Sequence, residues 1–431
     1  MSGLRSRAGA FARHLEARFR IVTFAGTLVP TVSALGVQLV AFALTARGLG
    51  LEAFGIYTAL LAVSALSVEL VGLGGADLLV RGVAREPERF ASYFGNLLIL
   101  TGLTLPLVVL GGVWVAHGVM ESPLPVLFVA LVIGGEILIG RAAASLELVM
   151  VAHRQTVRAG AVRFTTAFVR LLAAAIFFAA LGRSDLEGWI EVAFLQSVIT
   201  TALYLALSIR LYGRPRAVLL TRDLWTGLSF CLNQASRSSQ GSLDRIVLSR
   251  FADAASVGIY GAASRVLTLG LFPLQVVTRM TYPNFFVHGG RGGIAASRRY
   301  ALSVVPVMLG VGLAACGAVS LAGFLAPAVL GRDFESMVGV TAALSFSLPL
   351  MALQYPAADA LTGAGYQGLR AVLSVTAAFG FGIIMAFGAR LDGIEGLVIA
   401  FLSCHALFAA VLWTAAFRVR DRPEGREIAP A

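Results

Sequence analysis

Residues 224–251, LWTGLSFCLNQASRSSQGSLDRIVLSRF, are too polar for an ordinary membrane helix, yet they stand where such a helix is expected. Serines, amides and three charged residues crowd the centre of this stretch, and a hydropathy window would assign it to a loop. The segments on either side are long and apolar. The first question about this chain is therefore whether 224–251 is a loop or a polar membrane helix.

An internal repeat favours the helix. The segment 47–57 aligns with 250–260 at one constant offset of 203 positions, with arginine, glycine, isoleucine and tyrosine matching in the same register. In the first half this motif follows 21–46, an apolar segment that is long enough to span a bilayer. The same offset places the polar stretch in the position of that span. We therefore predict that 224–251 is one membrane-spanning helix.

The polar residues of this predicted helix share one face. Asn233, Arg237, Gln240 and Asp244 follow the spacing i, i+4, i+7 and i+11. Each charge at the centre of a span costs roughly 2.5–3.5 kcal/mol on insertion scales, so the face should line a water-filled cavity or contact protein partners. Arg245 lies off this stripe, and its long side chain is expected to reach outward.

The composition is typical of a chain that is mostly embedded in a membrane. Of its 431 residues, 58% are hydrophobic and 13% are charged, and the mean hydropathy is +0.84. All 34 basic residues are arginine, and their positions argue against reading the net charge of +11 as a nucleic-acid footprint. The three cysteines stand singly, which favours neither disulfides nor a metal site. We expect no metal, cofactor or nucleic acid to bind.

Hydropathy predicts an all-α membrane protein with about twelve transmembrane helices. Because six is even, two sets of six helices have the same orientation, as in parallel repeats. We expect two six-helix bundles, 21–211 and 224–417, joined by a cytoplasmic linker at 212–223. An amphipathic helix, 1–20, and a tail, 418–431, complete the chain. The expected spans are 21–46, 54–80, 95–117, 124–149, 158–181, 187–211, 224–251, 255–280, 301–326, 337–361, 369–389 and 395–417.

The distribution of arginine predicts the orientation of these spans. Counted over the short connecting segments and both ends, arginine is roughly fivefold more frequent on the side that holds the N-terminus, and basic segments stay in the cytoplasm. Both termini are therefore expected to be cytoplasmic. The longest connection should be the basic segment 282–300 on the same side.

Several charged residues lie at the depth of the spans and near the expected midplane, where transporters place their substrates. Arginine's planar fork suits phosphate, and amides suit sugar hydroxyls. The predicted substrate-binding residues are Arg237, Arg245, Arg265, Arg170, Arg141, Asn233, Gln240 and Asp244. A carboxylate that loses its hydration binds a proton more readily, so the candidates for ion coupling are Glu69, Glu136 and Asp359.

Each of these charges also has a structural interpretation, because a buried charge needs a partner. The alternative is a set of ion pairs: Arg237 with Glu69, Asp244 with Arg265, Arg170 with Glu136, and Arg141 with Glu136 or Glu147. The repeated Gly-Ile-Tyr motif is interpreted as architectural. Gly55 and Gly258 should permit a close approach of helices, and Tyr57 and Tyr260 should anchor at the outer interface.

The segment 45–89, TARGLGLEAFGIYTALLAVSALSVELVGLGGADLLVRGVAREPER, resembles the first two helices of bacterial oligosaccharide-lipid flippases of the Wzx type. These belong to the polysaccharide transporter branch of the superfamily that also contains the multidrug and toxin extrusion (MATE) exporters. The second half repeats the resemblance with Leu-Asp-Arg at 243–245, Val-Gly-Ile-Tyr at 257–260, Arg265 and Tyr-Pro at 282–283.

This resemblance implies two six-helix bundles around a central cationic cavity in the bacterial cytoplasmic membrane. The implied substrate is an undecaprenyl-pyrophosphate-linked oligosaccharide, which moves from the inner to the outer leaflet by alternating access. Besides this substrate, the implied partners are membrane lipids and the polysaccharide polymerase and assembly proteins, with the chain itself a monomer.

Two other function classes compete with a flippase. A MATE-like multidrug exporter driven by an ion gradient has the same fold, but the excess of intramembrane arginine favours an anionic substrate. An enzyme of glycan assembly usually needs a large outer loop with catalytic residues, and the expected spans leave only short loops. We therefore expect no catalytic residues.

Overall fold

The computed structural model describes residues 32–153, 155–239 and 241–419, and within these ranges the chain is helical and forms no strand. The predicted helix 1–20 and nearly all of the tail lie outside the described residues. The described chain divides into two compact units. Unit 1 contains 32–50 and 63–235, and unit 2 contains 51–62 and 236–419.

Between residues 90 and 212, the helices of unit 1 begin and end within a few residues of the predicted spans. Two helices, α2 and α8, contribute residues to both units. The elements are the helix Val32–Leu49, α2 (Leu51–Ser67), η1 (Val68–Leu70), α3 (Gly75–Arg85), η2 (Pro87–Arg89), α4 (Phe90–Gly118), α5 (Val126–Ala152), α6 (Thr156–Ala174) with the π-helical segment η3 (Ala175–Ala180), α7 (Leu186–Tyr212), η4 (Thr221–Asp223) and α8 (Leu224–Ser239).

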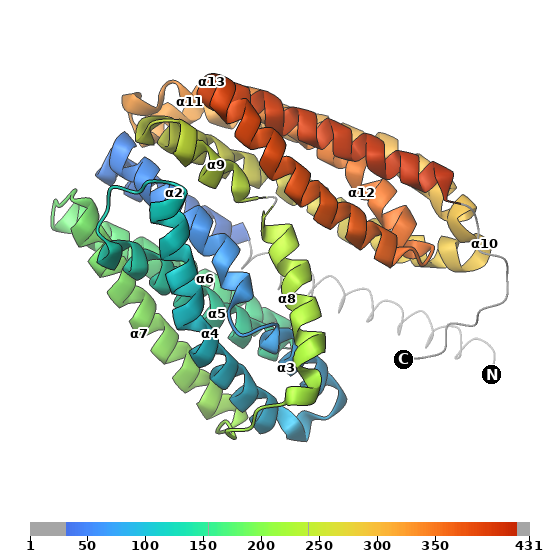
Figure 1. Ribbon diagram of the computed structural model, residues 1–431, viewed down its shortest axis with the longest axis horizontal. Coiled ribbons are helices and arrows are strands. Elements are labelled where there is room, and N and C mark those ends of the chain that lie inside the picture. The colour runs from blue at the N-terminus through green and yellow to red at the C-terminus, as the bar shows by residue number, and fades with distance from the viewer. Residues whose placement is uncertain (1–31, 154, 240, 420–431) are drawn as a thin grey trace, which may run out of the picture. The chain divides into compact units, whose positions relative to one another are not determined.

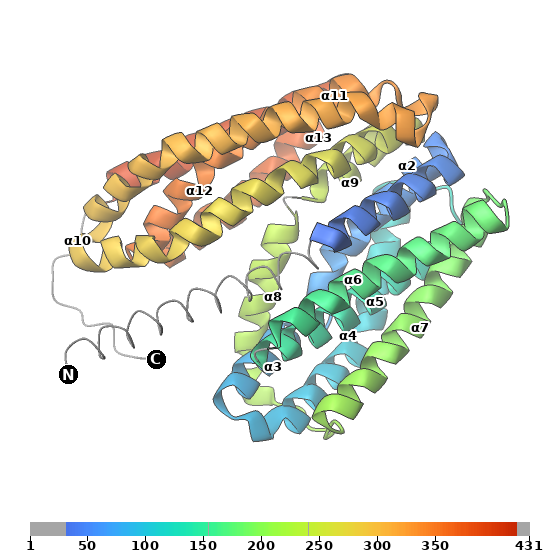
Figure 2. The same ribbon diagram turned by 180° about the vertical axis from the view of Figure 1, so that it is seen from behind.

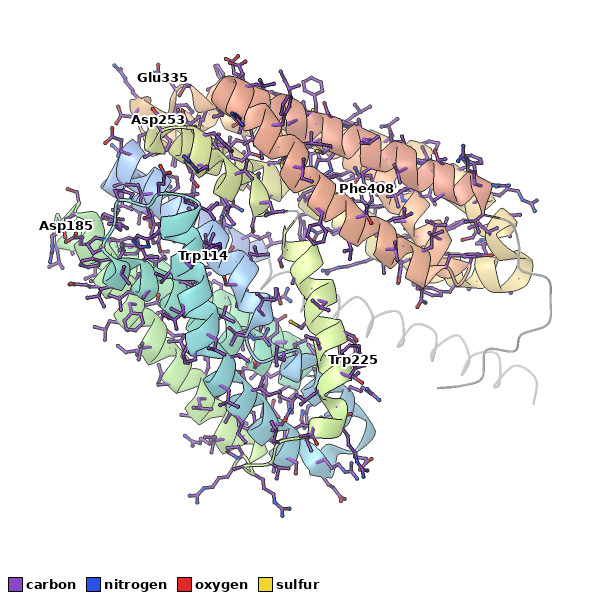
Figure 3. The ribbon with its side chains drawn as sticks, viewed as in Figure 1. Trp114, Asp185, Trp225, Asp253, Glu335 and Phe408 are labelled. Atoms are coloured by element: carbon purple, nitrogen blue, oxygen red, sulfur yellow. The ribbon has the colours of Figure 1, made fainter. Side chains whose placement is uncertain are left out.

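Helix α5 is the centre of unit 1 and packs against α3, α4, α6 and α7 (Figures 1 and 2). Buried residues near its C-terminal end belong to two apolar clusters, one shared with α3 and α4 and one shared with α6 and α7. By contrast, α4 exposes an apolar stripe along its outer side. Leu103, Leu107, Leu110 and Trp114 recur at helical spacing and are all well exposed, as expected for a face that meets lipid (Figure 3).

Unit 2 contains the first part of α2 and the remaining helices. Its core joins α10, α12 and α13 through small and aromatic side chains. The elements are the last residues of α8, α9 (Leu243–Phe251), α10 (Ala254–Leu330), η5 (Arg332–Phe334), α11 (Met337–Ser345), α12 (Ser347–Gly363) and α13 (Gln367–Arg418).

Helices α10 and α13 are each a hairpin of two helices. The backbone turns at Gly292–Gly293 and again at Asp392–Gly393, and the second residue has a positive φ in both turns, 58° and 51°, which glycine adopts without strain. The two arms of α10 run back along each other in Figure 2, and Phe285 stacks edge-on against Tyr300. The predicted loop at 282–300 is therefore wrong. Helix continues into the turn on both sides.

The helix count agrees with the predicted architecture. Nine helices of the described chain are long and apolar enough to cross a membrane. Two of these are the hairpins α10 and α13, each with two helices. Helices α8 and α9, of 16 and 9 residues, are not among the nine and together take the place of one predicted span. Together they correspond to twelve spans, so the prediction of an all-α membrane protein is confirmed.

The prediction of one continuous helix over 224–251 is wrong. Helix α8 ends at Ser239 and α9 begins at Leu243, and the amide of Gly241 closes a turn on the carbonyl of Ser238. Serine and glycine hold a helix poorly, because serine competes for backbone hydrogen bonds and glycine loses more entropy. The predicted single helix is therefore two helices, α8 and α9.

The repeated glycines meet inside unit 2. A Cβ on Gly55 would lie 1.8 Å from the carbonyl oxygen of Ala254, and a Cβ on Gly258 would lie 2.5 Å from that of Leu51. The close helix approach predicted for this motif is therefore confirmed. The predicted role of Tyr57 and Tyr260 at the interface is wrong, since both rings are buried.

The division expected from the sequence, at 223/224, differs from the two units in two segments. Residues 224–235 of α8 pack with unit 1, and residues 51–62 of α2 pack with unit 2. Trp225, at the start of α8, is 79% exposed and points away from the helix (Figure 3).

Candidate functional site

The most unusual charge in unit 1 is Arg141, at the middle of α5. Its Nη1 lies 3.9 Å from Glu69 Oε2, and 11% of its side-chain surface is exposed. Asp77 and the Cys231 thiol also interact electrostatically with the guanidinium. Among the described residues, Arg141 Nε and Nη2 have no hydrogen-bond partner. Two buried charged donors are thus left without an acceptor.

A broken helix shapes one side of this Arg141 centre, which we define as Arg141, Glu69, Asp77 and Cys231. Between η1 and α3 the three consecutive residues Gly72, Leu73 and Gly74 all have positive φ, at 77°, 46° and 71°. The amide of Gly72 donates to Thr104 Oγ1 at 2.9 Å. The predicted continuous span 54–80 is therefore wrong in its second half. Unwound backbone at membrane depth is tolerated where it is buried in protein, and it often marks a binding site.

Helix α8 covers the break from another side. A Cβ on Gly74 would lie 2.1 Å from the carbonyl oxygen of Gly227, so the backbones touch. One helical turn later, the Cys231 thiol donates to the carbonyl oxygen of Glu69 at 3.4 Å. The first part of the polar stretch therefore packs directly on the Arg141 centre.

Arg141 also lines a small cavity between α4, α5 and α7, with a volume of about 90 Å³. Most of its walls are apolar, but hydroxyls of Thr101, Ser145 and Thr201 lie in its lining. The Thr201 hydroxyl has no hydrogen-bond partner among the described residues. A space of this size holds a few water molecules or one small anionic group, since a water occupies about 30 Å³ in the liquid.

Arg170 and Glu136 form a complete pair in the same unit. Arg170 Nη2 lies 2.6 Å from Glu136 Oε2, across α5 and α6. The structural alternative for Arg170 is therefore confirmed. The alternative for Arg141, a pair with Glu136 or Glu147, is wrong. Glu147 instead forms a two-point contact with Arg163.

In unit 2, Asp244 and Arg245 stabilise the start of α9. Tyr260 donates to Asp244 Oδ2 at 2.9 Å, and the carboxylate is almost completely buried. Arg245 Nη2 donates back to the carbonyl oxygen of Gly241 at 2.6 Å, where the helix is interrupted. The expectation that Arg245 reaches outward is wrong, because the broken helix offers it a bare carbonyl nearby.

The remaining predicted residues are placed as follows. Asp359 on α12 is buried and accepts from Arg370 Nη1 at 3.0 Å, so this candidate for ion coupling has a firm cationic partner. Arg265 lies half-buried on α10. The side chains of Asn233 and Arg237 lie outside the described structure, although their backbone belongs to α8, and Gln240 lies outside it entirely.

The described residues contain no group of three or more metal-ligating side chains. The thiols of Cys231, Cys316 and Cys404 are free and buried. Sequence reasoning missed Gly72, Thr104 and Thr201 as neighbours of Arg141. The glycine cluster in VGLGG at 71–75 was the available signal for the break.

Comparison with known proteins identifies a family and a fold for this chain. The family described as polysaccharide biosynthesis protein matches residues 23–286. No curated protein sequence matches the chain.

Solved structures show the same fold at low identity. An inward-facing multidrug resistance MATE family transporter of the MOP superfamily is 14% identical and has a TM-score of 0.71, covering 89% of this chain and 94% of that one. A MOP superfamily transporter from Pyrococcus furiosus is 16% identical with a TM-score of 0.58, covering 91% and 94%. A MATE transporter of Vibrio cholerae is 17% identical with a TM-score of 0.57 and the same coverage.

Proposed function

The chain belongs to the polysaccharide biosynthesis protein family, and on this premise we propose that it is a flippase for an undecaprenyl-pyrophosphate-linked oligosaccharide. The proposed transport moves this lipid from the cytoplasmic to the outer leaflet of the bacterial inner membrane by alternating access. The arginine bias of the connecting segments supports an orientation with both termini in the cytoplasm. The short loops support a transporter over an enzyme.

The observation that carries this proposal is the pair of unused donors on Arg141. A buried donor without an acceptor costs about 1–3 kcal/mol, and more when it is charged. A phosphate oxygen at this position would remove that cost. Guanidinium groups also bind phosphate through two parallel hydrogen bonds, which suits the pyrophosphate head group. Arg141 is thus our proposed head-group contact in unit 1.

The other predicted substrate-binding residues fall into two groups according to their surroundings. Arg170 forms a close ion pair with Glu136 and is better explained as structural. Asn233, Arg237 and Gln240 remain proposed contacts for the sugar and the phosphate, and Arg265 remains the corresponding proposal in α10. Asp244 and Arg245 are better explained as supports for the start of α9.

Glu69 is the proposed residue for ion coupling. Within the Arg141 centre, one guanidinium interacts with two carboxylates, those of Glu69 and Asp77. A charged carboxylate beside the guanidinium repels an anionic head group, so neutralising it favours binding of the head group. Glu136 and Asp359 are held at shorter distances by Arg170 and Arg370.

The test is transport by variants of Arg141 in reconstituted vesicles. Arg141→Ala should reduce translocation of lipid-linked oligosaccharide at least about a hundredfold, because two charge-assisted hydrogen bonds are lost. Arg141→Lys should recover part of the activity, since the ammonium keeps the charge without the planar fork. Arg210→Ala, an exposed arginine at the end of α7, is the matched control and should transport normally.

Binding of inorganic pyrophosphate to the purified protein tests the coupling. Glu69→Gln removes one carboxylate charge beside Arg141, so it should bind pyrophosphate more tightly than the wild type at neutral pH. Normal translocation by Arg141→Ala would contradict the proposed site. Transport of organic cations, with no movement of the lipid-linked glycan, would instead establish the multidrug exporter.

A further inference from the structure

A large polar groove lies at the opposite end of unit 1 from the start of α7. It has a volume of about 970 Å³ and runs between the first turn of α4 and the segment that precedes α8. We call it the α4–η4 groove. Its lining residues are Glu86, Glu88, Arg89, Ser92, Tyr93, Arg216, Leu219, Leu220, Thr221, Arg222 and Asp223.

Specific contacts join the two walls of the groove. The amide of Arg216 donates to the carbonyl oxygen of Ala91 at 2.8 Å, and the amide of Leu220 donates to the buried side chain of Asn96 at 2.9 Å. Gly95 permits this approach, since a Cβ there would lie 1.7 Å from the carbonyl oxygen of Arg216. The segment predicted as a linker at 212–223 is therefore a fixed wall of the groove.

The charge balance of the lining limits what the groove can bind. Among the described lining residues, three carboxylates balance three guanidinium groups in charge. A site for phosphate, nucleic acid or an anionic lipid surface would carry an excess of cationic groups, and a cation site would carry an excess of carboxylates. The groove offers strong donors and strong acceptors in equal number.

We propose that the α4–η4 groove binds the glycan of the lipid-linked substrate before it enters the transport path. Sugar hydroxyls donate and accept hydrogen bonds at once, so they match a lining of guanidinium, carboxylate and hydroxyl groups. The volume lies at the upper end of the range for ligand sites, about 300–1,000 Å³, which suits an oligosaccharide. The balanced lining fits a glycan without net charge. This inference rests on the proposed function.

Tyr93 gives the groove an aromatic surface beside its charges. Its hydroxyl donates to Asp223 Oδ2 at 3.4 Å, which connects the two walls. One edge of its ring packs on Gly82, where a Cβ would lie 2.3 Å from Cε2. The ring is thus held in place by α3 and can receive the apolar face of a sugar.

The test uses the full-length protein in nanodiscs and a soluble probe. The probe is the oligosaccharide released by mild acid from the cells' own lipid-linked intermediate, so it lacks both pyrophosphate and lipid. Binding is measured by calorimetry. The double variant Glu88→Ala with Arg222→Ala removes one acceptor and one donor and keeps the net charge, and it should weaken binding at least about tenfold.

The matched control is Glu187→Ala with Arg210→Ala, an exposed carboxylate and an exposed arginine of unit 1 outside the groove. It should bind the probe like the wild type. The conservative variant Glu88→Gln with Arg222→Lys should recover part of the affinity, which separates lost contacts from misfolding.

Equal binding by the wild type and the double alanine variant would overturn this inference, as would the absence of binding at millimolar probe. If the double alanine variant loses a bound protein partner but still binds the probe normally, this inference is also overturned, and the groove is identified as a docking site for a protein. The proposed function is judged separately, by translocation of the intact lipid-linked substrate. If the intact lipid-linked substrate is translocated normally but the double alanine variant binds the probe like the wild type, only the groove proposal fails.

Discussion

Arg141 and Arg170 belong to the same unit, and each faces a glutamate on a neighbouring element, but their surroundings differ. Arg170 contacts Glu136 at 2.6 Å and has 38% of its side-chain surface exposed. Arg141 stands 3.9 Å from Glu69, is only 11% exposed, and has two nitrogens without partners among the described residues. The more deeply buried arginine is the less satisfied one.

This difference separates a structural charge from one that is available to a ligand. Burying a guanidinium is costly unless close hydrogen bonds replace its hydration. Arg170 offsets that cost through its close contact with Glu136. Arg141 does not, and the broken backbone at 71–74 and the cavity near Thr201 lie beside it. Both are arginines, and both belong to helices that are long and apolar enough to cross a membrane.

The largest effect on stability should come from the break that shapes the Arg141 centre. Gly74→Ala adds a Cβ at a positive φ and against the carbonyl oxygen of Gly227, so it should destabilise the protein by about 2–3 kcal/mol. Thermal unfolding in detergent measures this. Gly102→Ala, on α4 with open space around it, is the control and should be neutral or slightly stabilising. An unchanged Tm for Gly74→Ala would show that the backbone break beside Arg141 does not require glycine at position 74.

A smaller effect is expected from the satisfied pair. Arg170→Ala leaves Glu136 without its partner, and because the pair is partly exposed the cost should be about 1–3 kcal/mol. Protein abundance should fall while transport per molecule stays normal, the reverse of Arg141→Ala. Adding Glu136→Gln should restore abundance. Transport lost at normal abundance would mean that Arg170 also acts on the substrate.

The smallest effect belongs to a third pair, Arg183 with Asp185, which lies just before α7 and outside the spans (Figure 3). The Arg183 guanidinium lowers the pKa of the Asp185 carboxyl through a direct hydrogen bond. A lowered folded-state pKa stabilises the protein above the unfolded value of about 3.9, and this contribution disappears as the pH falls through the lowered value. Arg183 is 54% exposed, so solvent screens the pair.

Arg183→Ala should therefore leave transport unchanged and lower Tm only slightly at pH 7. The difference in Tm between wild type and variant should shrink toward zero as the pH falls through the lowered pKa of Asp185. A large loss of Tm at neutral pH, or a loss that grows on acidification, would contradict the expectation that the most exposed of the three arginine pairs has the smallest effect.

Hydropathy, the repeat at 203 positions and the arginine positions were enough to predict an all-α membrane protein with about twelve spans. They also predicted a close approach of helices at Gly55 and at Gly258. Such properties depend on segments of about twenty residues or on exact register between the halves, so they are written locally in the chain.

The breaks at 72–74 and 241–242 escaped that reasoning, because a hydropathy window averages over the few residues that turn the backbone. The partners of the buried arginines escaped it as well. Arg141 was assigned to acids on its own helix, but α5 packs so that it faces Glu69 from η1 and Asp77 from α3. Which acid a guanidinium meets depends on helix rotation and on side-chain reach across neighbours. Only the packed tertiary structure decides these, because an electrostatic interaction depends on distance in space and not on separation along the chain.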